Sequence, residues 1–176
     1  KSFWRQGDFY FYPKSLESEW TKTISAQNAE IAQSLPIRRD MVTLLKYLQD
    51  HSVRGTKATG NFPRKHVRAI SEKLVDPPQL DLVFEDRVFE MRSEDEVQDL
   101  MFLHIFANTT GLIYGAEGLV WEVTPFGEAF LESDPSSQAW YLTSCWLRDV
   151  NWYFLYFYDN YADLVDILTF TPSVKQ

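Results

Sequence analysis

The sequence contains little cysteine, glycine or histidine for its length. Its 176 residues include one cysteine, Cys145, together with 7 glycines and 3 histidines. A single cysteine excludes an internal disulfide framework and a cysteine-rich zinc site, and it is typical of a reducing compartment, so we expect a cytoplasmic protein. Because 45% of the residues are hydrophobic, a collagen-like or disordered chain is also excluded, and the length suits one compact unit.

Long apolar runs are absent as well. The longest run, residues 152–158, has seven residues and ends at Asp159, whereas roughly 20 are needed to cross a bilayer. Residues 1–8 contain no continuous apolar segment of the kind that a signal peptide has. We therefore expect no membrane partner. Because the first residue is Lys1 rather than Met, the sequence can be a piece of a longer protein.

Positive charge is scarce overall but concentrated in one segment. The formal net charge is −8, from 17 basic and 25 acidic residues. Residues 37–74 hold nine basic and three acidic residues, a local net charge of +6 that leaves −14 for the rest of the chain, much of it in residues 76–99. Such a segment is either an anion-binding patch or the electrostatic partner of its own acidic neighbour. We favour the second interpretation, because exposed charge more often serves solvation.

Hydrophobic periodicity predicts two helices within the basic segment. Between residues 40 and 49 the apolar positions recur at the spacing of one helix face. They are Met41, Leu44, Leu45 and Leu48. A turn over 53–61 precedes the second helix, in which Asn61 is the expected N-cap, Pro63 lies in the first turn, and 76–78 ends the helix.

The second helix is expected to expose a basic face. The side opposite its apolar residues carries Lys65, Arg68, Ala69 and Glu72, with Arg64 at its flank. Glu72 is spaced to pair with Arg68 at i, i+4. We expect the intervening His66 to be a solvated helix residue.

The middle of the chain predicts a small hairpin and a buried helix. Residues 80–84 and 87–91 are short and partly alternating, which suits a hairpin or irregular extended strands. Ser93 and Glu96 then fit a capping box, so we expect a largely buried helix over 94–108.

A second hairpin and further helices follow. Strands over 110–114 and 119–123 are joined by a turn and precede a helix that has Thr124 as its N-cap. Asp134 is the expected cap of the next helix, and residues 139–168 keep a helical pattern. A helix, a tight hairpin and a short helix in this order are typical of the wing region of a winged helix.

Four short motifs carry a resemblance. They are Leu44-Leu-Lys-Tyr-Leu48, Thr59-Gly-Asn-Phe-Pro-Arg-Lys-His-Val67, Gly111-Leu-Ile113 and Val123-Thr-Pro-Phe-Gly127. Together they resemble a winged-helix pattern in uncharacterised bacterial proteins, and they are similar to the N-terminal winged-helix region associated with XPB-like helicases. The resemblance covers 38–132, with Phe62 and Val123 where leucine is commoner. It implies a fold derived from the helix-turn-helix, which serves either DNA binding or protein interaction.

The expected fold class is mainly α with a small β-hairpin wing, an α+β fold. We expect a winged helix-turn-helix core over residues 36–134. An N-terminal aromatic arm over 1–35 and C-terminal helices over 135–176 extend this core, and together they form one compact unit.

Motifs for catalysis or cofactor binding are absent. The chain has no H-x-x-x-H, C-x-x-C, Walker A or G-x-G-x-x-G pattern, and its serines lack the G-x-S-x-G elbow. Cys145 lies among aromatic residues at helical spacing and His104 lies on an apolar helix, so both are expected in or beside the core. The acidic residues of 94–99 suit the positive end of a helix dipole better than a cation site. We expect no enzyme, cofactor, metal or small-molecule ligand.

Two functions remain open. We favour a non-catalytic protein-interaction or oligomerisation module, which binds a protein partner or forms a homodimer through aromatic residues of the last helix. The candidate interface residues are Trp152, Tyr153, Tyr156 and Tyr158. The alternative is a DNA-binding transcriptional regulator that uses the basic helix 63–74 within the segment 37–74. Its candidate nucleic-acid contacts are Lys57, Arg64, Lys65 and Arg68.

Overall fold

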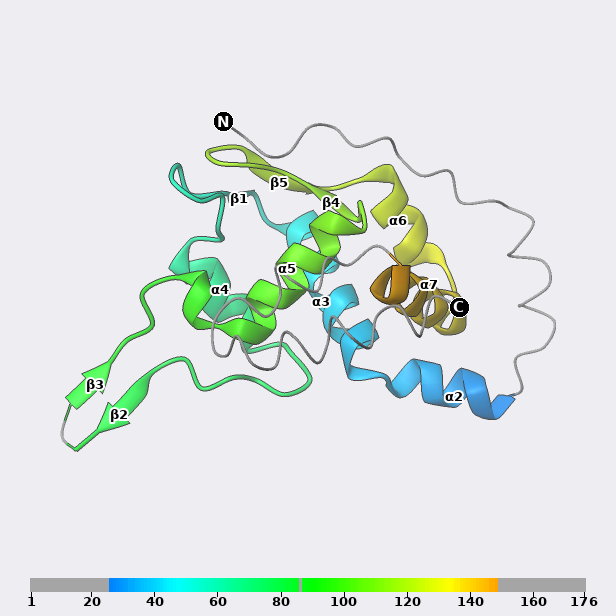
Figure 1. The fold of residues 1–176 in the computed structure, drawn as a ribbon, viewed down its shortest axis with the longest axis horizontal. Coiled ribbons are helices and arrows are strands. Elements are labelled where there is room, and N and C mark those ends of the chain that lie inside the picture. Colours follow the sequence, from blue (N-terminus) through cyan, green and yellow to red (C-terminus); the bar gives the residue numbers. More distant parts are fainter. Residues whose placement is uncertain (1–25, 86, 149–176) are drawn as a thin grey trace, which may run out of the picture.

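The structure is a computed structural model that describes residues 26–85 and 87–148. These residues are mainly helical and carry small antiparallel sheets (Figure 1). The expected α+β class is confirmed at this level. Residues 1–25 of the expected N-terminal arm and residues 149–176 of the expected C-terminal region lie outside the described residues.

The helices and strands follow one another along the chain in a mixed order. The helices are α2 (Ala26–Ser34), α3 (Pro36–Asp50), α4 (Arg64–Ser71), a 3-10 turn (Glu94–Glu96), α5 (Gln98–Thr109), α6 (Pro125–Glu132) and α7 (Pro135–Arg148). The strands are β1 (Val53–Arg54), β2 (Leu82–Phe84), β3 (Arg87–Phe89), β4 (Ile113–Tyr114) and β5 (Val120–Val123).

Helix α3 runs through the core. Its predicted apolar face is confirmed, because Met41, Leu44, Leu45 and Leu48 are all buried. Pro36 opens the helix at a position where its missing N–H costs no hydrogen bond. Figure 1 shows α3 crossing behind α5, with α6 and α7 near one of its ends. The helix therefore contacts most of the other core elements.

A three-stranded antiparallel sheet joins distant parts of the chain. Its order is β1-β5-β4, with Val53 opposite Trp121 and Ile113 opposite Val123. The predicted hairpin of β4 and β5 is confirmed, although both strands are shorter than expected. Strand β1 was not predicted, because a strand of two residues shows no periodicity.

Two predicted helix starts are confirmed. The Thr124 hydroxyl accepts a hydrogen bond from the Gly127 N–H of α6 (Oγ1 to N, 3.0 Å). At the start of α7, the Asp134 carboxylate accepts from the Ser136 N–H (Oδ1 to N, 2.9 Å). These caps satisfy backbone donors that a helix leaves without internal partners.

Two other expected caps are wrong. Helix α4 begins at Arg64, after Pro63, and the Asn61 amide instead donates to the Asp95 carboxylate (Nδ2 to Oδ1, 3.3 Å). Ser93 makes no capping hydrogen bond, and α5 begins only at Gln98. In both cases a longer-range contact outweighs the local motif, because the loop at 61–62 packs against the 94–96 turn.

Helix α6 lies very close to the main chain of Leu112, the residue before β4. A Cβ atom at Gly127 would overlap the carbonyl oxygen of Leu112 and crowd the Val123 side chain. Only glycine fits there, because main-chain atoms cannot move aside as a flexible side chain can.

We therefore expect Gly127→Ala to lower the free energy of unfolding by about 1–3 kcal/mol. Equilibrium urea denaturation of both proteins measures this difference. Glu132→Ala, at an exposed position of the same helix, is the control and should change stability by less than about 0.5 kcal/mol. Equal stabilities for Gly127→Ala and the parent chain would contradict the close approach.

Candidate functional site

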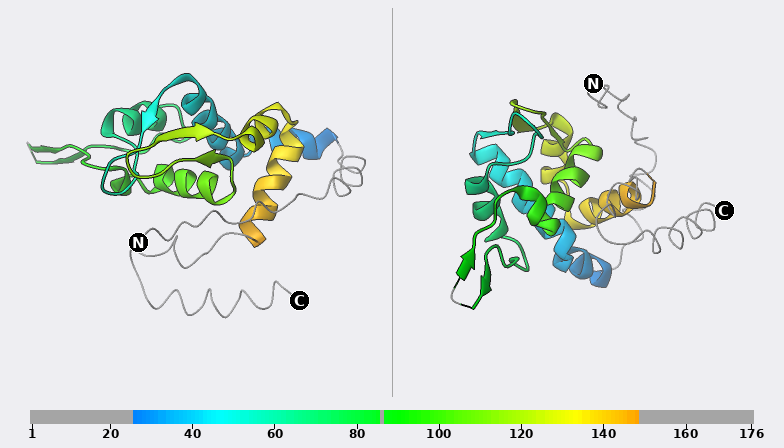
Figure 2. Two further views of the ribbon diagram at one scale, coloured as in Figure 1. Left: turned by 90° about the horizontal axis from the view of Figure 1, so that it is seen from above. Right: turned by 60° about the vertical axis from the view of Figure 1, so that its left-hand side comes forward.

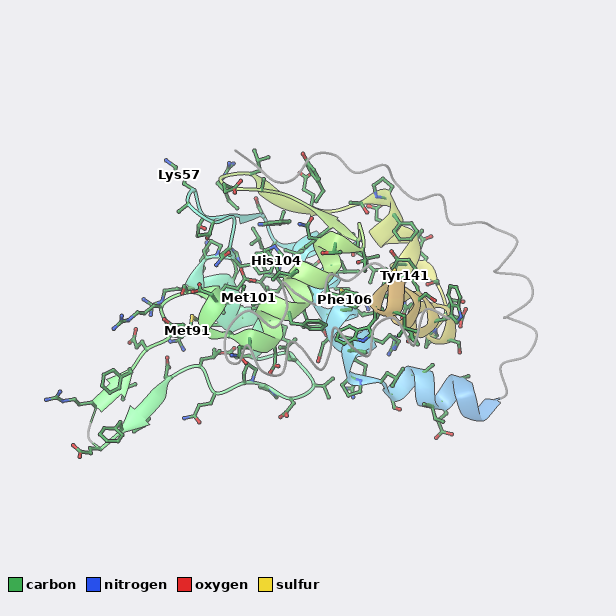
Figure 3. The ribbon with its side chains drawn as sticks, viewed as in Figure 1. Lys57, Met91, Met101, His104, Phe106 and Tyr141 are labelled. Carbon is green, nitrogen blue, oxygen red and sulfur yellow. The ribbon has the colours of Figure 1, made fainter. Side chains whose placement is uncertain are left out.

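The four predicted nucleic-acid contacts lie on one side of the molecule but not in one environment. Arg64, Lys65 and Arg68 lie on α4, and Lys57 lies in the loop between β1 and α4. Figure 3 shows Lys57 at the outer end of this loop, pointing away from the body. Lys57, Arg64 and Lys65 are exposed, whereas Arg68 is half-buried.

Arg68 is held in a bidentate ion pair. Its Nη2 donates to Asp81 Oδ1 (2.6 Å) and its Nη1 to Asp81 Oδ2 (3.0 Å). Asp81 Oδ1 also accepts the Met91 N–H (Oδ1 to N, 3.1 Å). The hydrogen bonds from Arg68 and then from Met91 lower the pKa of the Asp81 carboxyl, so the carboxylate keeps its charge. The expected pairing of Arg68 with Glu72 is wrong, because the planar guanidinium finds a better-matched acceptor in Asp81.

Arg64 also has an acidic partner from the same region. Its Nη2 lies 2.8 Å from Glu90 Oε2, and both side chains are exposed. Such a surface pair contributes little to stability. Its effect is to reduce the positive charge that α4 presents to solvent.

Among the described residues, Lys57 and Lys65 form no ion pair. They are the predicted nucleic-acid contacts that have no acidic partner in the described part of the chain. The interpretation that the basic segment pairs with its own acidic neighbour therefore holds for Arg64 and Arg68.

The acidic partners belong to a projecting hairpin. Asp81 and Glu90 flank β2 and β3, which pair with Val83 opposite Val88 and Phe84 opposite Arg87. We call residues 81–90 the apolar hairpin. Figure 1 shows it extending from the body beyond α4, and Figure 2 shows the same projection from two other directions. The predicted hairpin is thus confirmed.

The apolar hairpin exposes large hydrophobic side chains. Exposed fractions are 65% for Val83, 67% for Phe84, 62% for Val88 and 49% for Phe89. A grouped apolar surface of this kind marks an interaction site more often than single exposed residues do. Sequence reasoning missed this surface. The available signal was apolar residues at consecutive positions in both strands, which leaves neither face of a two-stranded sheet polar.

The carboxylate of Glu94 is buried next to the loop that precedes α4. The Glu94 side chain is 1% exposed and accepts the Phe62 N–H at Oε2 (2.6 Å). Its Oε1 lies 2.8 Å from Nδ1 of His104, whose ring stacks on Phe62 and meets Trp121 edge-on. The prediction that His104 is a core histidine is confirmed. Glu94 lies at a helical start, as expected, but in the 3-10 turn before α5, and its side chain is buried.

Glu94 turns inward because its two oxygens find two donors there. The main-chain N–H of Phe62 has no helical partner ahead of α4, and the His104 ring supplies the second donor. A buried carboxylate with such partners is an anchor for the loop at residue 62.

His66 also differs from expectation. It is buried rather than solvated, and its Nδ1 lies 2.8 Å from the Tyr47 hydroxyl oxygen. Burial lowers the pKa of His66, with smaller effects from Lys65 and His51. The Tyr47 ring stacks on His51 on one side, and Lys73 Nζ lies 5.1 Å from its centre. His66 is therefore part of the packing between α3 and α4.

The remaining predicted site residues are placed as follows. Cys145 is buried, as expected. Trp152, Tyr153, Tyr156 and Tyr158 lie outside the described residues, so the proposed aromatic interface stays a prediction.

Within residues 26–85 and 87–148, no group of three or more metal-binding side chains comes together. In this part of the chain, no helix has both the length and the apolar character to cross a membrane.

Comparisons with family models, with curated proteins and with solved structures give no match for this chain. Its function is therefore argued from the arrangement of its own residues.

We expect Glu94→Ala to lower the free energy of unfolding by about 3 kcal/mol or more, because two buried donors lose their acceptor. Urea denaturation followed by circular dichroism measures the loss. Asp95→Ala removes the neighbouring exposed carboxylate and should cost less than about 1 kcal/mol. Similar losses for the two variants would refute a special role of Glu94.

Stability should also fall as the pH falls below about 6.5, the ordinary pKa of histidine. Because the pKa of folded His66 is lowered, the unfolded chain takes up the proton first and unfolding becomes easier in acid. Urea denaturation at about pH 7.5 and about pH 5.5 tests this, since carboxyl groups do not titrate widely in that range. His66→Gln should show a smaller loss between the two pH values. An equal loss in both proteins would assign the effect to other groups.

Proposed function

We propose that this chain is a non-catalytic protein-interaction module built on a winged-helix-like core. The order α3, β1, α4, α5, β4 and β5, with β5 between β1 and β4, supports the winged-helix part of this proposal. In it β4 and β5 form the wing, and the segment between α4 and α5 carries the apolar hairpin as an insertion.

The single observation that carries the interaction role is the contrast between α4 and the apolar hairpin. Two carboxylates of the hairpin form ion pairs with Arg64 and Arg68, while its four valine and phenylalanine side chains stay exposed. A phosphate backbone requires uncompensated positive charge. A protein partner instead requires exposed apolar side chains that it can bury.

Helix α5 offers a second argument against DNA. In a helix-turn-helix the second helix enters the major groove. If α4 and α5 are that pair, the reading helix is α5, whose residues include Asp99 and no lysine or arginine. Its Leu100, Leu103 and Phe106 are buried in the core. Such a helix suits packing better than base recognition.

The wing formed by β4 and β5 is also poorly suited to binding DNA. Its turn contains Glu117 at an exposed position, and the carbonyl of Gly118 accepts from Arg54 Nη1 (2.6 Å). The acidic side chain would face a phosphate backbone with like charge. We also infer a cytoplasmic location from the reducing compartment that a single cysteine suits.

Binding of a labelled DNA duplex, followed by fluorescence anisotropy, separates this proposal from a DNA-binding regulator. We expect no binding in the micromolar range at about 50 mM salt. The alternative function would give affinity that falls steeply between about 50 and 200 mM salt. It would also require that Lys57→Ala and Lys65→Ala each weaken binding, because these side chains carry the uncompensated charge.

A further variant makes the test sharper. Asp81→Asn and Glu90→Gln together should free Arg68 and Arg64 from their acidic partners. If these carboxylates are what suppresses DNA binding, the double variant gains salt-dependent affinity that the parent chain lacks. Glu132→Gln, which removes an exposed charge on α6, is the control for net charge alone. Salt-sensitive DNA binding by the parent chain would overturn the proposed function.

A further inference from the structure

Both faces of the apolar hairpin carry hydrophobic side chains that the described residues 26–85 and 87–148 leave exposed. Cross-strand partners lie on the same face of a hairpin, so Val83 and Val88 share one face while Phe84 and Phe89 lie on the other. All four are exposed, with fractions from 49% to 67%.

The hairpin is also acidic, and its acids divide into two groups. Residues 81–90 hold four acidic residues and one basic residue, a local net charge of −3. Asp81 and Glu90, at the base, pair with α4 of the same chain. Glu85, at the tip, forms no ion pair among the described residues and has a positive φ of 53°, which a tight two-residue turn requires.

The complementary positive charge lies on the body of the same protein. Lys57 and Lys65 are exposed and form no ion pair in the described part of the chain. The hairpin projects away from the body (Figure 2), so its own acidic tip does not pair with these lysines. A second copy of the chain, in contrast, can bring an acidic tip to these lysines.

The receiving surface also has apolar area. Ala69 lies one helical turn after Lys65 on α4 and is half-buried, and Val75, just beyond α4, is 37% exposed. The surface of α4 and of the segment just beyond it therefore offers Lys65, the exposed part of Val75 and the part of Ala69 that does not pack against the core. This pattern matches an acidic hairpin with apolar faces.

Direct pairing of two hairpin edges is disfavoured by charge. Antiparallel pairing of β2 with β2 of a second copy, centred on Val83, would place Asp81 opposite Glu85 of the other copy. Like charges directly opposite each other destabilise a sheet. The hairpin is therefore expected to dock on the body of the other copy and not on its hairpin edge.

The available area is sufficient for a symmetric dimer. From their exposed fractions, the two phenylalanines and two valines offer roughly 350 Å² per hairpin. Two hairpins and the surfaces that they would cover offer at most about 1,400 Å² in total, an upper limit that lies within the size of a stable interface. One hairpin on its own does not reach this size.

We propose that the apolar hairpin docks against α4 of a second copy, in a twofold dimer in which each Glu85 meets Lys65 of the other chain. This inference rests on the proposed interaction function and names its partner. It makes Lys65 part of a protein interface.

Sedimentation velocity over a range of concentrations tests the proposal. The parent chain should form a dimer, and the Phe84→Ser and Phe89→Ser double variant should be a folded monomer at the same concentration, with circular dichroism as the check on folding. Leu119→Ser removes a side chain of similar exposure, 48%, from the turn between β4 and β5 and should leave the dimer intact. A parent chain that stays monomeric, or a dimer unaffected by the hairpin variant, would overturn the proposal.

Charge reversal tests the contact itself. Glu85→Lys alone and Lys65→Glu alone should each weaken dimerisation by about tenfold or more, since the symmetric dimer then holds two like-charged contacts. An equimolar mixture of the two variants should recover dimerisation, because both contacts then join opposite charges. No recovery in the mixture would refute the pairing of these residues.

The proposed dimer and the proposed function are tested by separate measurements. Dimerisation is read by sedimentation and DNA binding by anisotropy, with no shared measurement. A monomer that binds no DNA overturns the second copy as partner and leaves the interaction function standing. A dimer that binds DNA with steep salt dependence overturns the proposed function instead.

Discussion

The carboxylate of Glu94 lies at the point where three parts of the chain meet. It accepts the Phe62 N–H from the loop before α4 and lies against His104 of α5, whose ring packs between Phe62 and Trp121 of β5. Trp121 in turn donates from Nε1 to the Gly60 carbonyl (2.7 Å). Because a buried charge must keep its partners, these contacts hold the loop, the helix and the sheet in one arrangement. The position of α4, and with it the direction of its basic face, depends on this anchor.

The charge pattern of the chain has a structural meaning that the net charge conceals. Part of the basic segment is covered by acidic residues. Arg68 forms a bidentate pair with Asp81, and Arg64 forms a weaker pair with Glu90. Both acids lie at the base of the apolar hairpin. The same contacts that reduce the positive charge of α4 therefore also orient the hairpin.

Local sequence signals predicted the local features of the fold. The apolar face of α3, the Thr124 cap of α6 and the paired strands β4 and β5 follow from spacing within a few residues. The inward turn of Glu94, the burial of His66 against Tyr47 and the choice of Asp81 by Arg68 depend on residues brought close only by folding. For the candidate site, the sequence indicated the basic residues but not which of them remain uncompensated. The proposed preference for a protein partner over DNA rests on that difference.

The pairing of β1 with β5 has a consequence for how the protein forms. Val53 can take its place only after Trp121 has been synthesised, so the sheet closes across everything between them, including α4, the apolar hairpin and α5. Contacts of such long sequence separation form slowly compared with helices. During synthesis α3 and α4 can acquire helical structure early, yet they lack the strand that completes their surroundings. An unfinished chain would thus expose the core side of α3 until β5 emerges, and this is the stage at which the protein is most open to aggregation.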